Sequence, residues 1–161
     1  MSIDWKLLAD VRERQKTVAM GVVARDRAAA EHSQAQWREA EAARQQQVQN
    51  KALHWEATRG ALSGGQLSVA EFRHAGAWSG ALDAQIAQAG QTAAEAAQAH
   101  AEREQVLDQS RRQLRAAHGE LEKAQQMQQR ARSERLQLQE QRLEDNNEER
   151  TAQAWAMRRP A

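Results

Sequence analysis

One short stretch decides the fold: residues 60–72, which read GALSGGQLSVAEF. It holds three of the chain's eight glycines, whereas the single proline is Pro160, so no earlier residue lacks the backbone N–H that a helix needs. Gly64 or Gly65 can adopt the left-handed backbone conformation that ends a helix. We therefore expect a helix that precedes this stretch to stop within it.

The second half of the stretch has the features of a helix start. Ser68 can accept a hydrogen bond from an exposed backbone N–H of the first turn, and Glu71 is placed to bond back to Ser68. Leu67 and Phe72 occupy the two positions of a hydrophobic staple. Two independent signals thus predict one boundary, a sharp turn at residues 63–68.

Long helices are expected on both sides of this turn, at about residues 4–62 and 69–157. Ala, Gln, Arg and Glu supply more than half of the 161 residues, a composition typical of long helices. Disorder is the alternative for so polar a chain, but disorder usually accompanies a high net charge, and here the net charge is +1. The predicted fold class is therefore all-α, a single antiparallel coiled-coil hairpin over residues 1–161.

Apolar residues at spacings of three, four and seven mark the expected contact seam of the hairpin. In the first helix they are Leu8, Val11, Val18, Val22, Val48, Trp55 and Leu62. In the second helix they are Trp78, Leu82, Ile86, Leu107, Leu114 and Leu121. Alanine fills the seam between these groups, so the middle of the hairpin is weakly specified.

The position of the turn makes the two helices unequal in length. Folding there places Asp4 beside Met127, and the second helix continues beyond its partner by about 45 Å at 1.5 Å per residue. Exposed apolar side chains on this overhang indicate an interaction site, or else a segment that folds back or pairs with a second copy. Those side chains are Leu136, Leu138, Leu143, Trp155 and Met157.

Five tryptophans are unusual in a chain with one Phe and no Tyr. Trp55 and Trp78 flank the turn, and the register predicts that they lie near each other and lock that end of the hairpin. Trp155 lies on the overhang, where no intramolecular partner is expected, which makes it a candidate anchor for another protein.

The sequence offers little for catalysis or metal binding. It has no Cys, no glycine-rich phosphate loop and no nucleophile elbow, and its five His are spread along both helices without a pair on one face. We therefore expect a protein that is not an enzyme and has no cofactor. The N-terminus resembles neither a signal peptide nor a membrane span, which favours the cytoplasm, and the small net charge gives no attraction to nucleic acid.

Charged residues gather in two places. The N-terminal part of the first helix is basic, with Arg12 and Arg14 among its cations. Residues 144–149, EDNNEE, form an acidic run between Arg142 and Arg150. Each group can be an ordinary solvated helix face or a docking patch for another protein.

Three segments together resemble one family, the FliJ-like stalk proteins of bacterial type III export and their injectisome counterparts, the YscO proteins. The closing segment AWAMRRP, residues 154–160, resembles the family's last residues, and it follows an acidic helix as it does there. The opening LADVRER (residues 8–14) and the stretch WSGALDAQI (residues 78–86) are similar to the family's start and to its pattern after the turn. The tyrosines that flagellar members carry before the turn are absent, which tilts the resemblance towards the injectisome branch.

The resemblance implies a stalk that enters the pore of a hexameric export ATPase and contacts the cytoplasmic domain of the export-gate protein. Export chaperones are a further implied partner, and the implied location is the cytoplasmic side of the inner-membrane export apparatus. The implied ATPase-binding residues are Arg12, Arg14, Leu143, Arg150, Trp155, Met157 and Arg158. The implied gate-binding or chaperone-binding residues are Gln47, Trp55, Trp78 and Leu82. A general coiled-coil scaffold or adaptor and a self-assembling structural rod are the alternatives.

Overall fold

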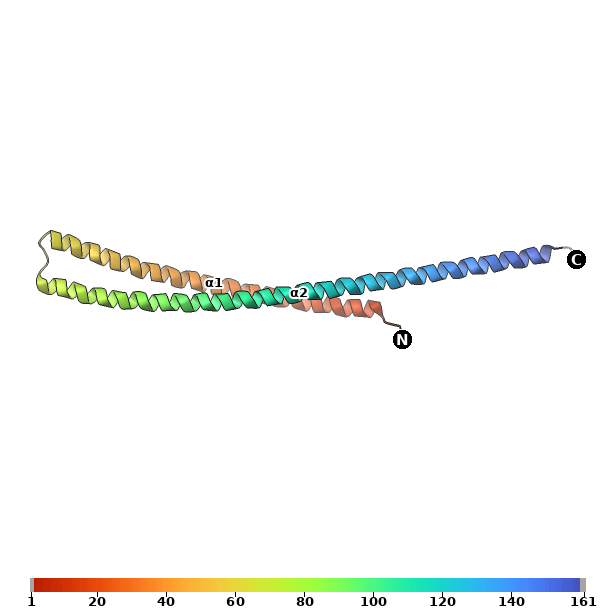
Figure 1. Cartoon of the computed structure of the whole chain (residues 1–161), viewed down its shortest axis with the longest axis horizontal. Helices are drawn as coiled ribbons and strands as arrows, with labels where there is room; N and C mark the ends of the chain where they lie inside the picture. Colours follow the sequence, from red (N-terminus) through yellow and green to blue (C-terminus); the bar gives the residue numbers. More distant parts are fainter. Residues whose placement is uncertain (1, 160–161) are drawn as a thin grey trace. The chain divides into compact units, whose positions relative to one another are not determined.

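A computed structural model describes residues 2–159, and it contains two α-helices joined by a short turn (Figure 1). Helix α1 spans Trp5–Ser63 and helix α2 spans Val69–Arg158. No strand occurs among the described residues. The predicted all-α class and the two helix ranges are confirmed to within a residue or two; the sole proline, Pro160, lies outside the described residues.

The end of α1 is a Schellman motif built around one glycine. Gly65 has a φ of 67°, in the left-handed region, and its N–H donates to the carbonyl of Leu62 at 3.2 Å. The N–H of Gln66 donates to the carbonyl of Ala61 at 3.0 Å. These two bonds satisfy carbonyl groups that the end of a helix otherwise leaves free.

Both helices begin at side-chain caps. Ser68 Oγ accepts from the N–H of Glu71 at 3.2 Å, and a Glu71 carboxylate oxygen accepts from the N–H of Ser68 at 3.2 Å, which is the predicted capping box. At the start of α1, Asp4 Oδ1 accepts from the N–H of Leu7 at 3.0 Å. The predicted start of this helix near Asp4 is correct, but the Asp cap was not predicted.

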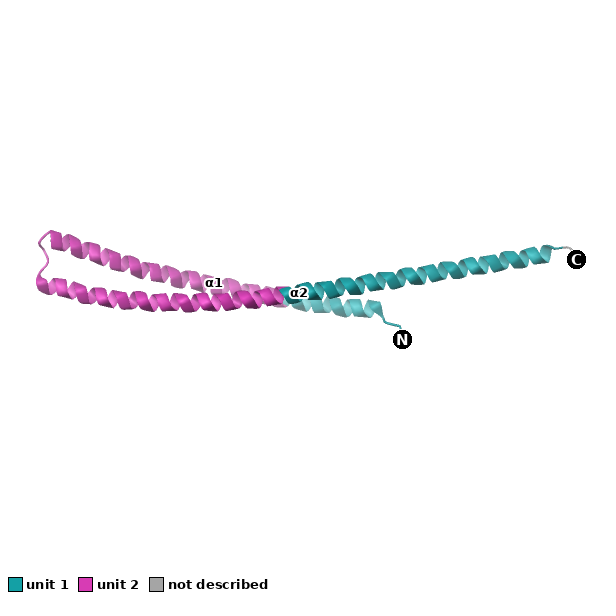
Figure 2. Ribbon diagram, in the orientation of Figure 1, with its two compact units in different colours: residues 1–21, 112–161 teal, residues 22–111 magenta. Residues whose placement is uncertain are grey.

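The helices take part in two compact units (Figure 2). Unit 2, Val22–Arg111, is a hairpin in which the later part of α1 packs antiparallel to the early part of α2 across the turn. Unit 1, Met1–Gly21 with Arg112–Ala161, contains the first turns of α1 beside the later part of α2.

The seam of unit 2 buries small and polar side chains together. Its buried apolar residues are Val23, Ala30, Leu82, Ala93 and Leu107, and its buried polar residues are Asp26, Ser33, Thr58, Ser79 and Ser110. Ser33 Oγ lies 2.9 Å from His100 Nδ1, and the imidazole of His100 stacks on Trp37 with ring centroids 5.8 Å apart. Hydrogen bonds therefore assist the thin apolar seam in holding the two helices together.

Side chains near the turn connect the two helices of unit 2 in three places. Trp55 Nε1 donates to Ser79 Oγ at 3.0 Å, and His54 Nε2 donates to the carbonyl of Ala75 at 3.1 Å. Lys51 and Asp83 form an ion pair across the seam. These bonds fix the register of the helices close to the turn.

The predicted seam is largely correct in α2, where only Trp78 is exposed, and it is wrong at four positions of α1. Leu82, Leu107 and Leu121 are buried as expected. Four predicted seam residues of α1 are instead exposed by 39% to 68%: Val11, Val18, Val48 and Leu62. The buried residues of α1 are instead mostly small or polar: Ala9, Val23, Asp26, Ala30, Ser33 and Thr58.

Candidate partner-binding surfaces

The last part of α2 in unit 1 lies beyond the residues that α1 covers. Every residue from Arg132 to Arg159 is exposed, whereas Leu121 and Ala124, a few turns earlier on the same helix, are each only 3% exposed. We call residues 132–158 the C-terminal extension. Its large apolar side chains are exposed by 53% to 87%: Leu136, Leu138, Leu143, Trp155 and Met157.

Trp155 is the only aromatic residue of the C-terminal extension. The guanidinium carbon of Arg159 lies 4.9 Å from the centroid of its ring, within the range of a cation–π contact. Two shallow hollows border the indole. One is lined by Asn147, Glu148, Thr151 and Ala152 with Trp155, and the other by Arg150, Thr151, Ala154 and Arg158 with Trp155.

The structure therefore brings together three of the seven residues expected to bind an ATPase: Arg150, Trp155 and Arg158. Leu143 and Met157 are exposed on the same helix but line neither of these hollows.

Arg12 and Arg14 lie on the first turns of α1. Arg12 contacts Glu120 of α2, with a guanidinium nitrogen 3.9 Å from a carboxylate oxygen, and it donates to Gln15 Oε1 at 3.0 Å. Arg14 is exposed. Of the two, Arg14 is the freer to meet a partner, because Arg12 is half-buried and already pairs within unit 1.

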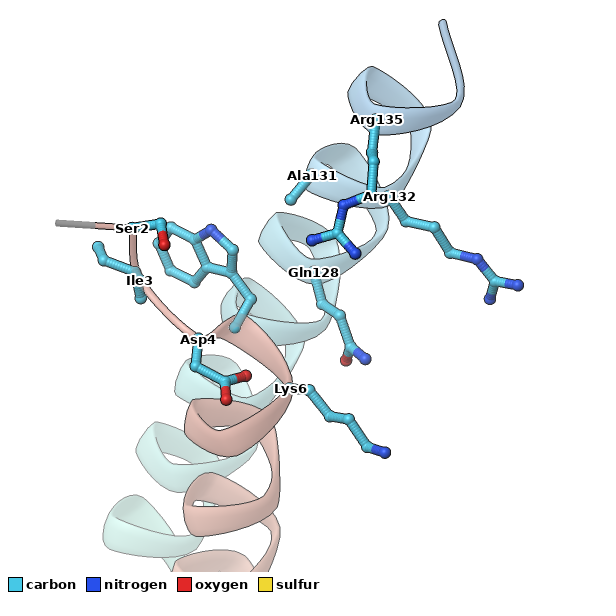
Figure 3. Close-up of a pocket in the computed structure, with 9 residues that line it drawn as sticks. Ser2, Ile3, Asp4, Lys6, Gln128, Ala131, Arg132 and Arg135 are labelled. Carbon is cyan, nitrogen blue, oxygen red and sulfur yellow. The ribbon is translucent and has the colours of Figure 1, made fainter. Parts of the chain in front are cut away.

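A basic hollow at the start of α1 was not found from the sequence (Figure 3). Its volume is about 700 Å³, and its lining combines the indole of Trp5 with three cations, Lys6, Arg132 and Arg135, and one carboxylate, Asp4. None of these cations makes an ion pair within the described chain. The register set by the turn places α2 residues just after Met127 beside Asp4, so the signal was present in the sequence.

The four residues expected to bind an export gate do not form one surface. Trp78 is 53% exposed, but Leu82 is only 5% exposed because its side chain packs in the seam. The indole of Trp55 bonds to Ser79, next to Trp78, whereas Trp78 itself is exposed, so of the two tryptophans Trp55 is the one that links the helices.

Of these four residues, Gln47 is the one with an unsatisfied polar atom. Its Oε1 is buried and has no hydrogen-bond partner. The residue borders an open hollow of about 440 Å³ together with Ala43, Ala84, Gln85, Gln88 and Ala89. A donor group of a bound protein would satisfy this oxygen, whose lack of a partner is otherwise unfavourable.

Charges close to this hollow are paired. Arg44 donates to the two carboxylate oxygens of Glu41, from Nη2 at 2.5 Å and from Nε at 3.1 and 3.2 Å. This hydrogen bonding and the nearby positive charge hold the pKa of the Glu41 carboxyl below its ordinary value. Neither group therefore offers a free charge to a partner.

Within residues 2–159, no group of His, Asp and Glu side chains is arranged to hold a metal ion. No helix in that range combines the length and apolar character needed to cross a membrane. No protein-family model, curated protein or solved structure matches the chain.

Proposed function

We propose that this chain is a non-enzymatic central stalk of a type III secretion export apparatus, of the FliJ-like and YscO-like kind. In this role it binds the hexameric export ATPase and the cytoplasmic domain of the export-gate protein, and it couples ATP hydrolysis to protein export. It acts in the cytoplasm at the inner-membrane apparatus, and export chaperones are further partners. The ATPase performs the chemistry.

The observation that carries the proposal is the C-terminal extension of α2. All of its side chains are exposed, and its large apolar residues include Leu143, Trp155 and Met157. Apolar surface of this kind on a single helix normally marks a site for another protein. The extension also carries the first five residues of AWAMRRP (residues 154–160), the segment that most resembles the proposed family.

The contacts with a ring are expected to be weak and largely electrostatic. One stalk cannot form six equal interfaces with six subunits at once, so strong contacts with one subunit would stop the stalk from turning or shifting. Exposed ion pairs typically contribute about 0–1 kcal/mol each, which suits such a role. Arg14, Arg150 and Arg158 are the exposed cations we assign to it.

The second proposed contact, with the export gate or a chaperone, uses the part of unit 2 near the turn. Trp78 is exposed, and Gln47 offers an oxygen that lacks a donor. Leu82 supports this surface from within the seam and does not touch the partner.

The test is ATP hydrolysis by the cognate hexamer with and without this protein. We expect the full chain to raise the rate, and a chain ending at Asn147 to lose that effect while keeping its helicity per residue. A matched control, Trp78→Ala, is expected to keep the stimulation, since Trp78 lies in unit 2. No binding and no change in rate with the full chain would refute the proposal.

A general scaffold or adaptor is the second candidate, since exposed leucines and tryptophans can bind unrelated proteins. Such a protein would capture several unrelated clients from the native host and would not affect the ATPase. A pull-down analysed beside the hydrolysis assay separates the two functions.

A further inference from the structure

We infer that α2 forms an antiparallel pair with a second copy of this chain through residues 130–149. The inference rests on the charges of unit 1 and not on the proposed function. The opposing surface is the same stretch of the second copy, so the pair has twofold symmetry and each contact occurs twice.

Two clusters of unpaired charge lie on this stretch. The first is mainly basic and comprises Arg130, Arg132 and Arg135, which outnumber the one carboxylate among them, Glu134; Lys6 of α1 lines the same hollow as Arg132 and Arg135 (Figure 3). The second is acidic and comprises Glu144, Asp145, Glu148 and Glu149. Within the described chain, none of these side chains forms an ion pair, although their neighbour Glu120 is paired with Arg12 and Lys123.

The order of the clusters selects one orientation. Their centres are separated by about 14 residues, or about 21 Å along a helix, so neither cluster can neutralise the other within one chain. A parallel pair of helices would put like charges together. An antiparallel pair puts the basic cluster of each copy against the acidic cluster of the other, and it does so at both ends of the contact.

The leucines between the clusters fit the same arrangement. The midpoint of the two clusters falls near Gln139 and Glu140, and Leu136 and Leu143 are symmetric about that point. The twofold axis that pairs the charges therefore brings Leu136 of one copy to the level of Leu143 of the other. Both leucines are more than half exposed in the single chain, and the pairing removes them from water.

The basic hollow at the start of α1 completes the contact. In this register the acidic run of the second copy reaches Arg132, Arg135 and Lys6, where Trp5 supplies an apolar wall. The dimer covers much of the extension that is proposed to enter the ATPase ring, so pairing and ring binding exclude each other. The ion pairs are exposed and the leucines few, so the dimer is expected to form in the micromolar range.

Charge reversal tests the arrangement. We propose one variant with Arg132→Glu and Arg135→Glu, and a second with Glu144→Arg and Glu149→Arg, each studied by sedimentation velocity over a range of concentrations. Each variant alone should dimerise about a hundredfold more weakly than the unmodified chain. An equal mixture should recover a dimer, since the stretch of the first variant is then strongly net acidic and faces the net basic stretch of the second.

A matched control carries the same change in charge elsewhere. Arg27→Glu with Arg38→Glu alters two exposed arginines of unit 2 and should leave dimerisation unchanged. Raising the ionic strength from about 0.05 M to about 0.5 M should weaken the unmodified dimer at least about tenfold. Circular dichroism confirms that each variant remains helical.

Three results would overturn the inference. The first is an unmodified chain that stays monomeric throughout the micromolar range, and the second is a dimer that either charge-reversed variant leaves intact. The third is a mixture of the two variants that remains monomeric. The proposed ATPase stimulation is measured separately, and its failure would leave the dimer unaffected.

Discussion

The turn-proximal part of unit 2 and the C-terminal extension of unit 1 are both regular helix, yet they differ in what holds them. Near the turn, Trp55, His54 and Lys51 of α1 each bond to α2, and the turn itself closes with a Schellman motif and a capping box. Residues 132–158 are exposed throughout, and α1 buries none of them. The first region specifies the fold, whereas the second is free to meet another molecule.

The same substitution should therefore have different effects in the two regions. Leu107 is 4% exposed, and Leu107→Ala should lower the free energy of unfolding by about 2–3 kcal/mol through lost burial and the cavity left behind. Leu143 is 62% exposed, and Leu143→Ala should change the free energy of unfolding by less than about 0.5 kcal/mol. Urea unfolding followed by circular dichroism measures the free energy of unfolding of both variants. Equal losses would show that the two regions do not differ in how they are packed.

The next largest effect is expected at the turn. Gly65→Ala should destabilise by about 1–2 kcal/mol, because Gly65 has a φ of 67° and an L-residue is strained there. Gly60→Ala serves as control, since Gly60 is helical and a Cβ at either glycine would meet nothing within 4 Å. We expect Gly60→Ala to stabilise by about 0.5 kcal/mol, so thermal unfolding midpoints should move in opposite directions.

Substituting one tryptophan in each of the two regions should also give different losses of stability. Trp55→Phe removes the donor to Ser79, whose side chain is buried, and should cost about 1 kcal/mol. Trp155→Phe removes no bond between helices, so the unfolding midpoint should not move. A cost for Trp155→Phe as large as that for Trp55→Phe would show that the extension packs against the rest of the chain.

The smallest effect is expected from the ion pair between Lys51 and Asp83. Both groups are partly exposed, so Asp83→Asn should cost at most about 0.5 kcal/mol, and the difference should disappear in high salt. Asp145→Asn in the extension should have no effect on stability at any ionic strength. Unfolding at low and high salt tests both variants, and a salt-independent loss for Asp83→Asn would contradict the assignment.

The sequence predicted the turn well because its signals are local. A left-handed glycine, a serine cap and its glutamate partner lie within a few residues of one another, and each has one structural meaning. The seam of α1 depends on the facing helix, so its pattern was less informative. Val18 and Val48 have the spacing of core residues and are exposed, yet the polar Asp26, Ser33 and Thr58 are among the residues that α1 buries.

The candidate surfaces, too, have some features that the sequence predicts and others that depend on how the helices pack. The exposure of Leu143, Trp155 and Met157 followed from the register alone. The burial of Leu82 and the outward position of Trp78 depend on the rotation of α2 about its axis, which spacing did not determine. The basic hollow at Trp5 joins residues far apart in sequence; the register brought their levels together, but the hollow itself depends on how their side chains lie.

The start of α1 at Trp5 divides the backbone amides of α2 into two classes. Amides before about Ala131 exchange with solvent only when the paired helices open, whereas those of the extension depend on helical hydrogen bonds alone. A helix without tertiary packing is marginal in water, so exchange should spread inward from the C-terminal end and slow sharply where α1 begins. Any molecule that covers the extension will move this boundary, and amide exchange will map its footprint before its identity is known.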